Sequence, residues 1–178
     1  MIWKNIPFVK RKHEGQEDKK TVRRGVLRRR WLVNTLVTTF AIVAIAVSAF
    51  SLSIYNYYLA TILATLESKA QTAAGMFQNY TETTYLYAAR QFINQFEEKT
   101  TIEVQFLTPD GEVLMTSLMD ISGATPQGQD IPDAIKTQEL STWRGEDTST
   151  RDYVMAASAP IVYNGSVVGV VRLVTSLR

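Results

Sequence analysis

The pattern of apolar and polar positions divides the 178-residue chain into three parts. Residues 31–66 contain no charged side chain, and their most apolar part, residues 32–54, contains twelve Leu, Ile, Val or Phe residues. A helix of these 23 residues is about 34 Å long, enough to cross the roughly 30 Å hydrocarbon core of a bilayer. Trp31 and Tyr55 stand at its ends, where aromatic rings favour the headgroup region. We therefore predict a transmembrane helix at residues 31–55.

Two other interpretations of this stretch are a cleaved signal peptide and a helix that lies on the membrane surface. A signal peptide has an apolar region of about 7–15 residues after a short basic lead, whereas this run is longer and follows 30 residues. The small residues around Ser48 could still serve as a cleavage site, so this alternative stays open. A surface helix needs a charged face, which residues 31–66 lack.

Residues 56–100 contain no Pro and one Gly, and their apolar residues recur every three to four positions, as in a helix. A first apolar stripe suits a second copy of the chain, because a helix that leaves a membrane has no other neighbour to cover it. Its members are Leu59, Ile62, Leu66, Ala70, Ala73, Phe77 and Tyr80. A second stripe, from Tyr85 to Phe96, suits a helix on a sheet. We predict a homodimer through residues 56–99, with packing inside one chain as the alternative.

From residue 101 the period of the apolar pattern changes to two, which indicates strands. Strands are predicted at residues 102–106, 112–117, 141–145, 152–162 and 166–175. Pro109-Asp110-Gly111 predicts a turn, and Asn164-Gly165 is a strong hairpin signal. A short helix is predicted at residues 132–140, with Asp130 as its N-cap. The expected fold class is α+β, a long helix packed on a mainly antiparallel sheet of about five strands in residues 101–178.

Charge is distributed unevenly and predicts the topology. Residues 1–30 contain 11 Lys and Arg against 3 Asp and Glu, a net charge of +8, whereas residues 31–178 contain 8 against 14, a net charge of −6. Basic residues beside a membrane span stay in the cytoplasm, so residues 1–30 form a cytoplasmic tail and residues 56–178 are extracytoplasmic. The arginine cluster at residues 23–30 is interpreted as this topology signal with affinity for anionic lipid, and not as a nucleic-acid site.

The chemistry of the chain gives no sign of catalysis. Zero Cys and one His exclude disulfides and leave few ligands for a transition metal. His13 lies in a charged tail, and a role as phosphoacceptor is disfavoured. No Gly-rich phosphate loop or nucleophile–base pair is present. Five acidic residues scattered through predicted turns make a poor cation site: Asp130, Asp133, Glu146, Asp147 and Asp152. We predict no catalytic residue, metal or cofactor in these 178 residues.

Several short motifs of the predicted sheet carry a resemblance to a known family. These are TPDGEVLMTS at residues 108–117, Trp143-Arg144-Gly145, Ala159-Pro160, and the closing run from Gly165 through Val168-Gly169-Val170 and Arg172 to Leu177. Together they resemble the extracytoplasmic PAS-like (single Cache) sensor domain of bacterial membrane-bound sensor histidine kinases. The resemblance covers about residues 31–178, and the closing hairpin is its most specific part.

The resemblance implies a function and a site. A PAS-like sheet can bind a small molecule or peptide in its concavity, where an Arg with an aromatic neighbour could hold a carboxylate. The candidate ligand-binding residues are Trp143, Arg144, Arg151, Tyr153 and Arg172. The kinase chemistry would belong to the full-length protein, so we expect the reading frame to continue past Arg178 into a second span and a cytoplasmic kinase.

The function predicted from sequence is that of a membrane-anchored signal-sensing module, the input end of a two-component histidine kinase. It would pass a change in helix packing through the bilayer. The alternative is a bitopic scaffold of the cell envelope that uses its long helix only to dimerise. A scaffold does not need a PAS-like sheet, so the Asn164-Gly165 hairpin favours the sensor.

Overall fold

The computed structural model describes residues 14–79, 82–98, 100–118, 123–147 and 151–177. His13 and Tyr80, which were considered above, lie outside these residues. The helices and strands are α1 (Glu14–Phe77), α2 (Glu82–Gln95), β1 (Glu103–Leu107), β2 (Val113–Thr116), α3 (Asp130–Thr137), β3 (Ser141–Glu146), β4 (Tyr153–Tyr163) and β5 (Ser166–Ser176).

The chain divides into two compact units, residues 1–55 and residues 56–178. In the first unit, α1 is helical from Glu14 onward, and every described side chain from Arg28 to Tyr55 is exposed. The helix is long and apolar enough to cross a membrane, and none of its most apolar stretch is buried in the protein. These properties fit the transmembrane helix predicted at residues 31–55.

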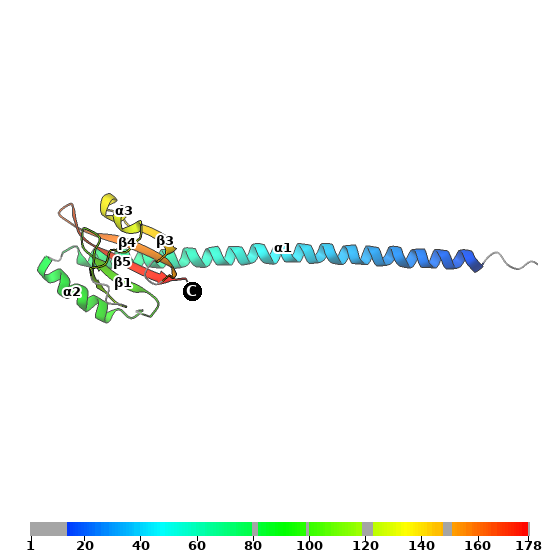
Figure 1. Ribbon diagram of the computed structural model, residues 1–178, viewed down its shortest axis with the longest axis horizontal. Helices are drawn as coiled ribbons and strands as arrows, with labels where there is room; N and C mark the ends of the chain where they lie inside the picture. The colour runs from blue at the N-terminus through cyan, green and yellow to red at the C-terminus, as the bar shows by residue number, and fades with distance from the viewer. Residues whose placement is uncertain (1–13, 80–81, 99, 119–122, 148–150, 178) are drawn as a thin grey trace, which may run out of the picture. The chain divides into compact units, whose positions relative to one another are not determined.

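The second unit is built on a five-stranded sheet with the strand order β2-β1-β5-β4-β3. Every neighbouring pair of strands is antiparallel. Figure 1 shows α2 and α3 on opposite sides of this sheet. The predicted α+β fold with a mainly antiparallel sheet of about five strands is therefore confirmed.

Strands β4 and β5 are buried on both faces, which explains their nearly continuous apolar sequences. On the α1/α2 face, alternate residues such as Ala157 and Leu173 join one large hydrophobic cluster with both helices. On the α3 face, Val170 packs with Ile131 of α3, and Val174 packs with Ala156 in a smaller cluster. The sheet is thus the middle layer between two helical layers.

Residues 56–100 form two helices and not the single one expected from sequence. Phe77, the last residue of α1, and Tyr85 of α2 have ring centroids 5.7 Å apart, and both rings contact Phe106 of β1. In a continuous helix these two residues would be separated by about 12 Å along the axis. The break between α1 and α2 therefore lets both helices cover the same aromatic cluster on the sheet.

The first apolar stripe of this region is covered by the chain itself. Leu59, Leu66, Ala70, Ala73 and Phe77 are buried in the same cluster as the α1/α2 face of the sheet. Assigning this stripe to a second copy of the chain is therefore wrong. An amphipathic pattern shows that one face of a helix is buried, but it does not identify what covers that face.

Helix α3 begins two residues earlier than predicted and ends at Thr137. Its N-cap is Gln129, which makes no side-chain capping bond, so the prediction that Asp130 caps the helix is wrong. At the other end, Gln138 takes a left-handed conformation with φ of 58°, and its side-chain Nε2 donates to the carbonyl of Gly165 at 3.1 Å. This bond ties the end of α3 to the β4–β5 turn.

The Asn164-Gly165 turn joins β4 and β5 as predicted, with positive φ values of 50° and 78°. Both central residues of a type I′ turn need this conformation, which β-branched side chains resist. Gly165→Val should therefore destabilise the 56–178 unit by about 1–3 kcal/mol, whereas Asn164→Gly should be nearly neutral. Urea unfolding of the full chain in detergent micelles measures both effects. Equal stability of the Gly165→Val variant and the wild type would contradict the turn type.

Candidate functional site

A row of polar residues crosses the α3 face of the sheet from one edge to the other. The strand register places Arg172 of β5 beside Ser158 of β4 and beside Gln105 of β1. Thr116 of β2 and Ser141 of β3 extend the row to the two edges. Gln105, Ser158 and Arg172 are buried, although they lie between two helical layers in largely apolar strands. Buried polar groups need partners, so this row must be bonded internally or to α3.

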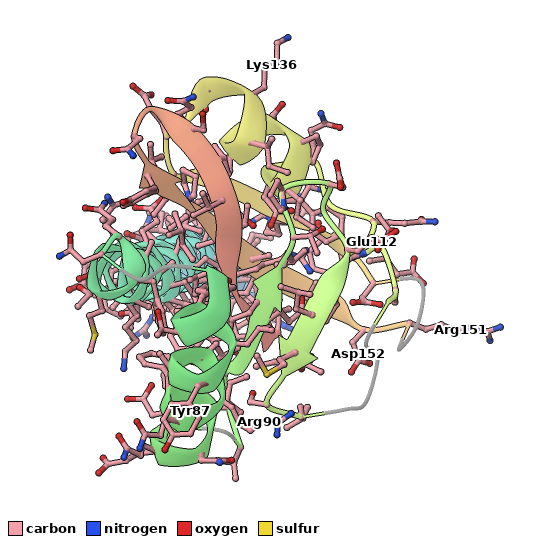
Figure 2. All side chains as sticks on the ribbon, turned by 90° about the vertical axis from the view of Figure 1, so that its left-hand side faces the viewer. Tyr87, Arg90, Glu112, Lys136, Arg151 and Asp152 are labelled. Carbon is pink, nitrogen blue, oxygen red and sulfur yellow. The ribbon has the colours of Figure 1, made fainter. Side chains whose placement is uncertain are left out.

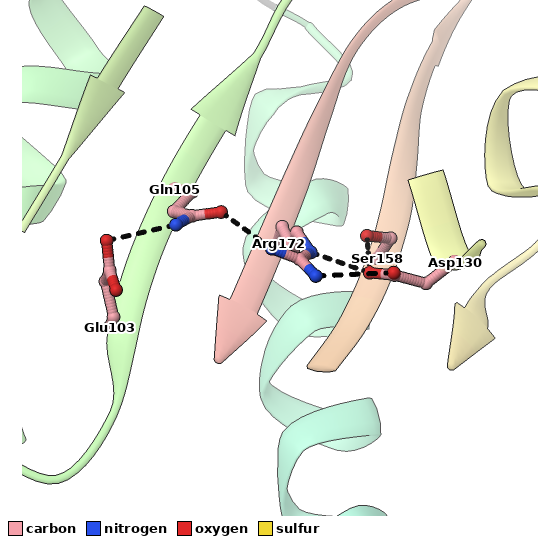
Figure 3. Close-up of polar contacts among 5 residues, drawn as sticks. All are labelled: Glu103, Gln105, Asp130, Ser158 and Arg172. Carbon is pink, nitrogen blue, oxygen red and sulfur yellow. Dashed lines mark hydrogen bonds and ion pairs between the residues drawn. The ribbon is translucent and has the colours of Figure 1, made fainter. Parts of the chain in front are cut away.

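The partner that α3 supplies is the carboxylate of Asp130. Arg172 donates from Nε to Oδ2 of Asp130 at 2.7 Å and from Nη2 to Oδ1 at 3.4 Å. Ser158 donates its hydroxyl to the same Oδ2 at 2.7 Å. The exposed fraction of Arg172 is 1%, and that of Asp130 is 0%. The two charges therefore neutralise each other away from water, in a fork geometry that favours arginine–carboxylate pairs (Figure 3).

The other side of the guanidinium group is held by the neighbouring strand. Arg172 donates from Nη1 to Oε1 of Gln105 at 3.1 Å, and Gln105 donates from Nε2 to Glu103 at 3.0 Å. Glu103 also accepts a bond of 2.6 Å from the hydroxyl of Thr116. Figure 3 shows most of this chain of bonds, which runs from α3 across β4, β5 and β1. Gln105 of β1 and Asp130 of α3 therefore hold the guanidinium group of Arg172 between them.

Gly128 lies directly against the ion pair. A Cβ atom on this residue would clash with Oδ1 of Asp130 and would lie 2.7 Å from Nη2 of Arg172. The backbone before α3 can approach the charges only because position 128 has no side chain. Gly128 thus covers the pair with backbone alone.

An open pocket of about 480 Å³ lies next to this backbone cover. The pocket is lined by the residues on either side of Asp130 in the chain, including Gly128, Gln129 and Ile131, whereas Asp130 itself is buried. Ile135 of α3 and Trp143 of β3 add apolar and aromatic surface, and Asp110 adds a carboxylate. A concave mixture of apolar walls and a few polar groups suits a small organic molecule.

The structure brings together only two of the five predicted site residues. Trp143 lines the pocket, and Arg172 lies on the same face of the sheet beneath Gly128. Arg144 and Tyr153 alternate with residues of that face, so their side chains are on the other face, and both are exposed. Arg151 projects outward from the loop before β4 (Figure 2). Arg172 is also not free to hold a ligand carboxylate, because Asp130 already occupies its fork.

Sequence analysis did not include Asp130, Ser158, Gln105 or Gly128 among the ligand-site residues. Asp130 was considered as a helix cap and as part of a cation site, and neither role matches its contact with Arg172. Ser158 and Arg172 each interrupt an otherwise apolar strand, and this interruption is a signal that could have paired them. Asp130, the partner that α3 supplies, lies in a polar segment and does not interrupt an apolar pattern in this way.

Comparison with known proteins assigns the chain to a family. Residues 83–178 match the model of the dCache_3 family, described as "double sensory domain of two-component sensor kinase". The chain belongs to this Cache family. The predicted resemblance to an extracytoplasmic Cache sensor domain is therefore confirmed. No curated protein matches the chain.

The fold is similar to that of a solved chemoreceptor domain, Tlp3. The ligand-binding domain of Campylobacter jejuni chemoreceptor Tlp3 in complex with 4-methylisoleucine matches with a TM-score of 0.53 and 18% identity, covering 70% of this chain and 55% of that chain. The Tlp3 sensory domain with isoleucine bound gives 0.50 and 18%, covering 70% and 56%. The domain of the Pseudomonas aeruginosa amino-acid chemoreceptor PctC in complex with GABA gives 0.47 and 21%, covering 71% and 56%. The chain spans about half the length of these chemoreceptor domains.

The buried pair makes a testable contribution to the stability of the Cache domain. Arg172→Met leaves the Asp130 carboxylate buried without its cation, which should cost about 3–5 kcal/mol. The double variant Arg172→Met with Asp130→Ala removes both charges and should be more stable than Arg172→Met alone. Urea unfolding of the full chain in micelles measures the series.

Asp133→Ala is the matched control, because it removes another carboxylate of the same helix that is outside the pair and should change stability by less than about 0.5 kcal/mol. If the double variant is no more stable than Arg172→Met, the stability lost in Arg172→Met does not come from the unpaired carboxylate of Asp130.

Proposed function

We propose that the chain is the membrane-anchored, extracytoplasmic sensing part of a receptor of the sensor histidine kinase type. Its Cache domain would bind a small molecule in the pocket beside α3 and pass the change to the cytoplasm. The observation that supports this function best is the position of the pocket. It is built by the segment before α3, by α3 itself and by Trp143, so a ligand there contacts an element that a buried ion pair and the packing of Ile131 hold to the sheet.

Helix α1 supports the anchoring part of the proposal. It carries an exposed apolar stretch, and farther along it contributes Leu66, Ala70 and Phe77 to the core of the 56–178 unit. A helix rooted in a sensor core is a suitable element for passing a small displacement onward. The +8 and −6 charge split places residues 56–178 outside the cytoplasm in this proposal.

The kind of ligand is suggested by the solved relatives as well as by the pocket. The titles of the Tlp3 and PctC structures record complexes with isoleucine, 4-methylisoleucine and GABA. A pocket of about 480 Å³ with Trp143 and Ile135 in its wall is suited to a molecule of this size. We therefore propose a small organic metabolite as the signal.

A homodimer remains part of the proposal, on a different surface of α1 from the one first predicted. The buried stripe belongs to the chain's own core, but Ala60, Ala64 and Ser68 are exposed and recur every four residues. Small side chains at this spacing allow two helices to approach closely. Two copies would therefore meet along these residues.

Ligand binding is tested by melting the full chain in lipid nanodiscs with a panel of amino acids, short carboxylates and amines. At least one compound should raise the melting temperature of the wild type in a saturable way. Trp143→Ala should abolish this rise, because it removes the aromatic wall of the pocket. Arg144→Ala is the matched control, since Arg144 is exposed on the neighbouring position of β3 outside the pocket, and it should respond like the wild type. No response to any compound would contradict the sensing role.

Topology and dimerisation are tested together by single cysteines, since the chain contains none of its own. A cysteine at Ser68 should react with a membrane-impermeant maleimide from outside intact cells. Cysteines at Ala60, Ala64 and Ser68 should form disulfides between copies under mild oxidation, whereas Ala73→Cys, which is buried in the core, should not. Labelling of Ser68→Cys only after cell lysis would reverse the orientation, and equal crosslinking at Ala64 and Ala73 would contradict the dimer surface.

A further inference from the structure

We propose that Arg172 and Ser158 form a carboxylate-binding site that the chain occupies with its own Asp130, and that the signal is a carboxylate-bearing molecule that competes for it. This inference rests on the proposed sensing function and names the chemical class of the ligand. Three features of the Cache domain support it: donors fixed by the sheet, an acceptor delivered by a short helix, and a thin cover beside the pocket.

The donors of the site belong to the sheet and not to α3. Arg172 and Ser158 are direct cross-strand partners on β5 and β4, and both direct a hydrogen bond of 2.7 Å to one oxygen of the bound carboxylate. Gln105 holds the guanidinium group from the side of β1. An arginine fork with an adjacent hydroxyl is a suitable arrangement for a carboxylate group. The sheet therefore presents donors that recognise a carboxylate group, whichever molecule carries that group.

The carboxylate that fills the site comes from the start of α3, where the next residue, Ile131, packs in the core with Val170. Asp130 is the first residue of an eight-residue helix, and this helix has no side-chain cap at its N-terminus. A helix this short is marginal without tertiary contacts. The far end of α3 is held separately by the bond from Gln138 to Gly165. Opening the site would therefore require the start of α3 to lift together with the buried Ile131, while the end of the helix stays attached at Gln138.

The pocket lies where a competing ligand would need to bind. Gly128 covers the ion pair with backbone only, and Gly128, Gln129 and Ile131 all line the pocket. A displacement of this one segment would turn Asp130 out and bring Arg172 to the floor of the pocket. The apolar body of the ligand would then rest against Ile135 and Trp143.

Competition between Asp130 and a free carboxylate also predicts which carboxylates bind to the wild type. A carboxylate that the fold already holds in the bonding geometry competes far more effectively than the same group free in solution. Formate, which has no apolar body, should therefore bind poorly to the wild type. A larger carboxylate gains contacts with the pocket and can compete. Removing Asp130 should open the site even to formate.

The first test is chemical rescue of Asp130→Ala in the full chain in lipid nanodiscs. This variant leaves Arg172 without its carboxylate, so its melting temperature should fall below that of the wild type. Formate or acetate should raise it in a saturable way, and chloride at the same ionic strength should not. Asp133→Ala should show no carboxylate-specific rise, and the double variant Asp130→Ala with Arg172→Met should lose the rescue. Equal effects of formate and chloride on Asp130→Ala would overturn the site.

The second test does not depend on the folding of that variant. Asp130→Asn keeps the shape of the side chain but replaces the charged acceptor with a weaker neutral one. Phenylacetate, used as a carboxylate with an aromatic body, should bind Asp130→Asn about tenfold more tightly than the wild type, which corresponds to about 1.4 kcal/mol. Phenylacetamide, which lacks the charge, should bind both proteins much more weakly than phenylacetate does. Equal affinity of phenylacetate for the two proteins would show that Asp130 is not a competitor.

The outcomes separate this inference from the proposed function. If only amines stabilise the wild type, the protein is still a sensor, but the carboxylate class is wrong. If no compound stabilises the wild type while formate rescues Asp130→Ala, the carboxylate site exists and the sensing role fails.

Discussion

The ion pair between Asp130 and Arg172 is the interaction on which the α3 side of this Cache domain depends. Moving two charges out of water is expensive, and only a close, well-oriented pair with further hydrogen bonds offsets the cost. Here Ser158 and Gln105 supply those bonds, so one set of contacts joins β4, β5 and β1 to the start of α3. A slip of one residue in β5 would turn Arg172 to the other face, into the hydrophobic cluster beneath α1 and α2.

The sheet could be predicted from sequence because its signals are local. The alternation of side chains in residues 102–106 and the Asn164-Gly165 turn are each signals that lie within a few consecutive residues. The ion pair joins positions 42 residues apart in sequence, and nothing in the spacing of Asp130 and Arg172 identifies them as partners. Trp143 and Arg172 were recognised as chemically unusual residues in a sheet. Arg144, Arg151 and Tyr153 were chosen for the same reason, but strand alternation and loop position take them away from the pocket.

Helix α1 illustrates a different limit of sequence analysis. Its repeating apolar residues were correctly interpreted as a buried face, but the covering surface was assigned to a second chain. The chain's own sheet supplies that surface, because the helix break before α2 lets Phe77 and Tyr85 both contact Phe106. The period of the apolar residues shows which face of a helix is buried, whereas the element that covers this face is set by contacts distant in sequence.

The two faces of β5 suggest how the α3 side could influence the helical side. Arg172 faces α3, while its chain neighbours Val171 and Leu173 belong to the same hydrophobic cluster as Leu66 and Phe77 of α1. A close-packed core does not absorb displacement gradually, so a shift of β5 large enough to move the guanidinium group must also repack residues on its other face. Any shift of β5 on the α3 side would then change the packing of α1 through a single strand. The polar contact of Arg172 on one face and the apolar contacts of Val171 and Leu173 on the other are linked, because adjacent residues of one strand make them.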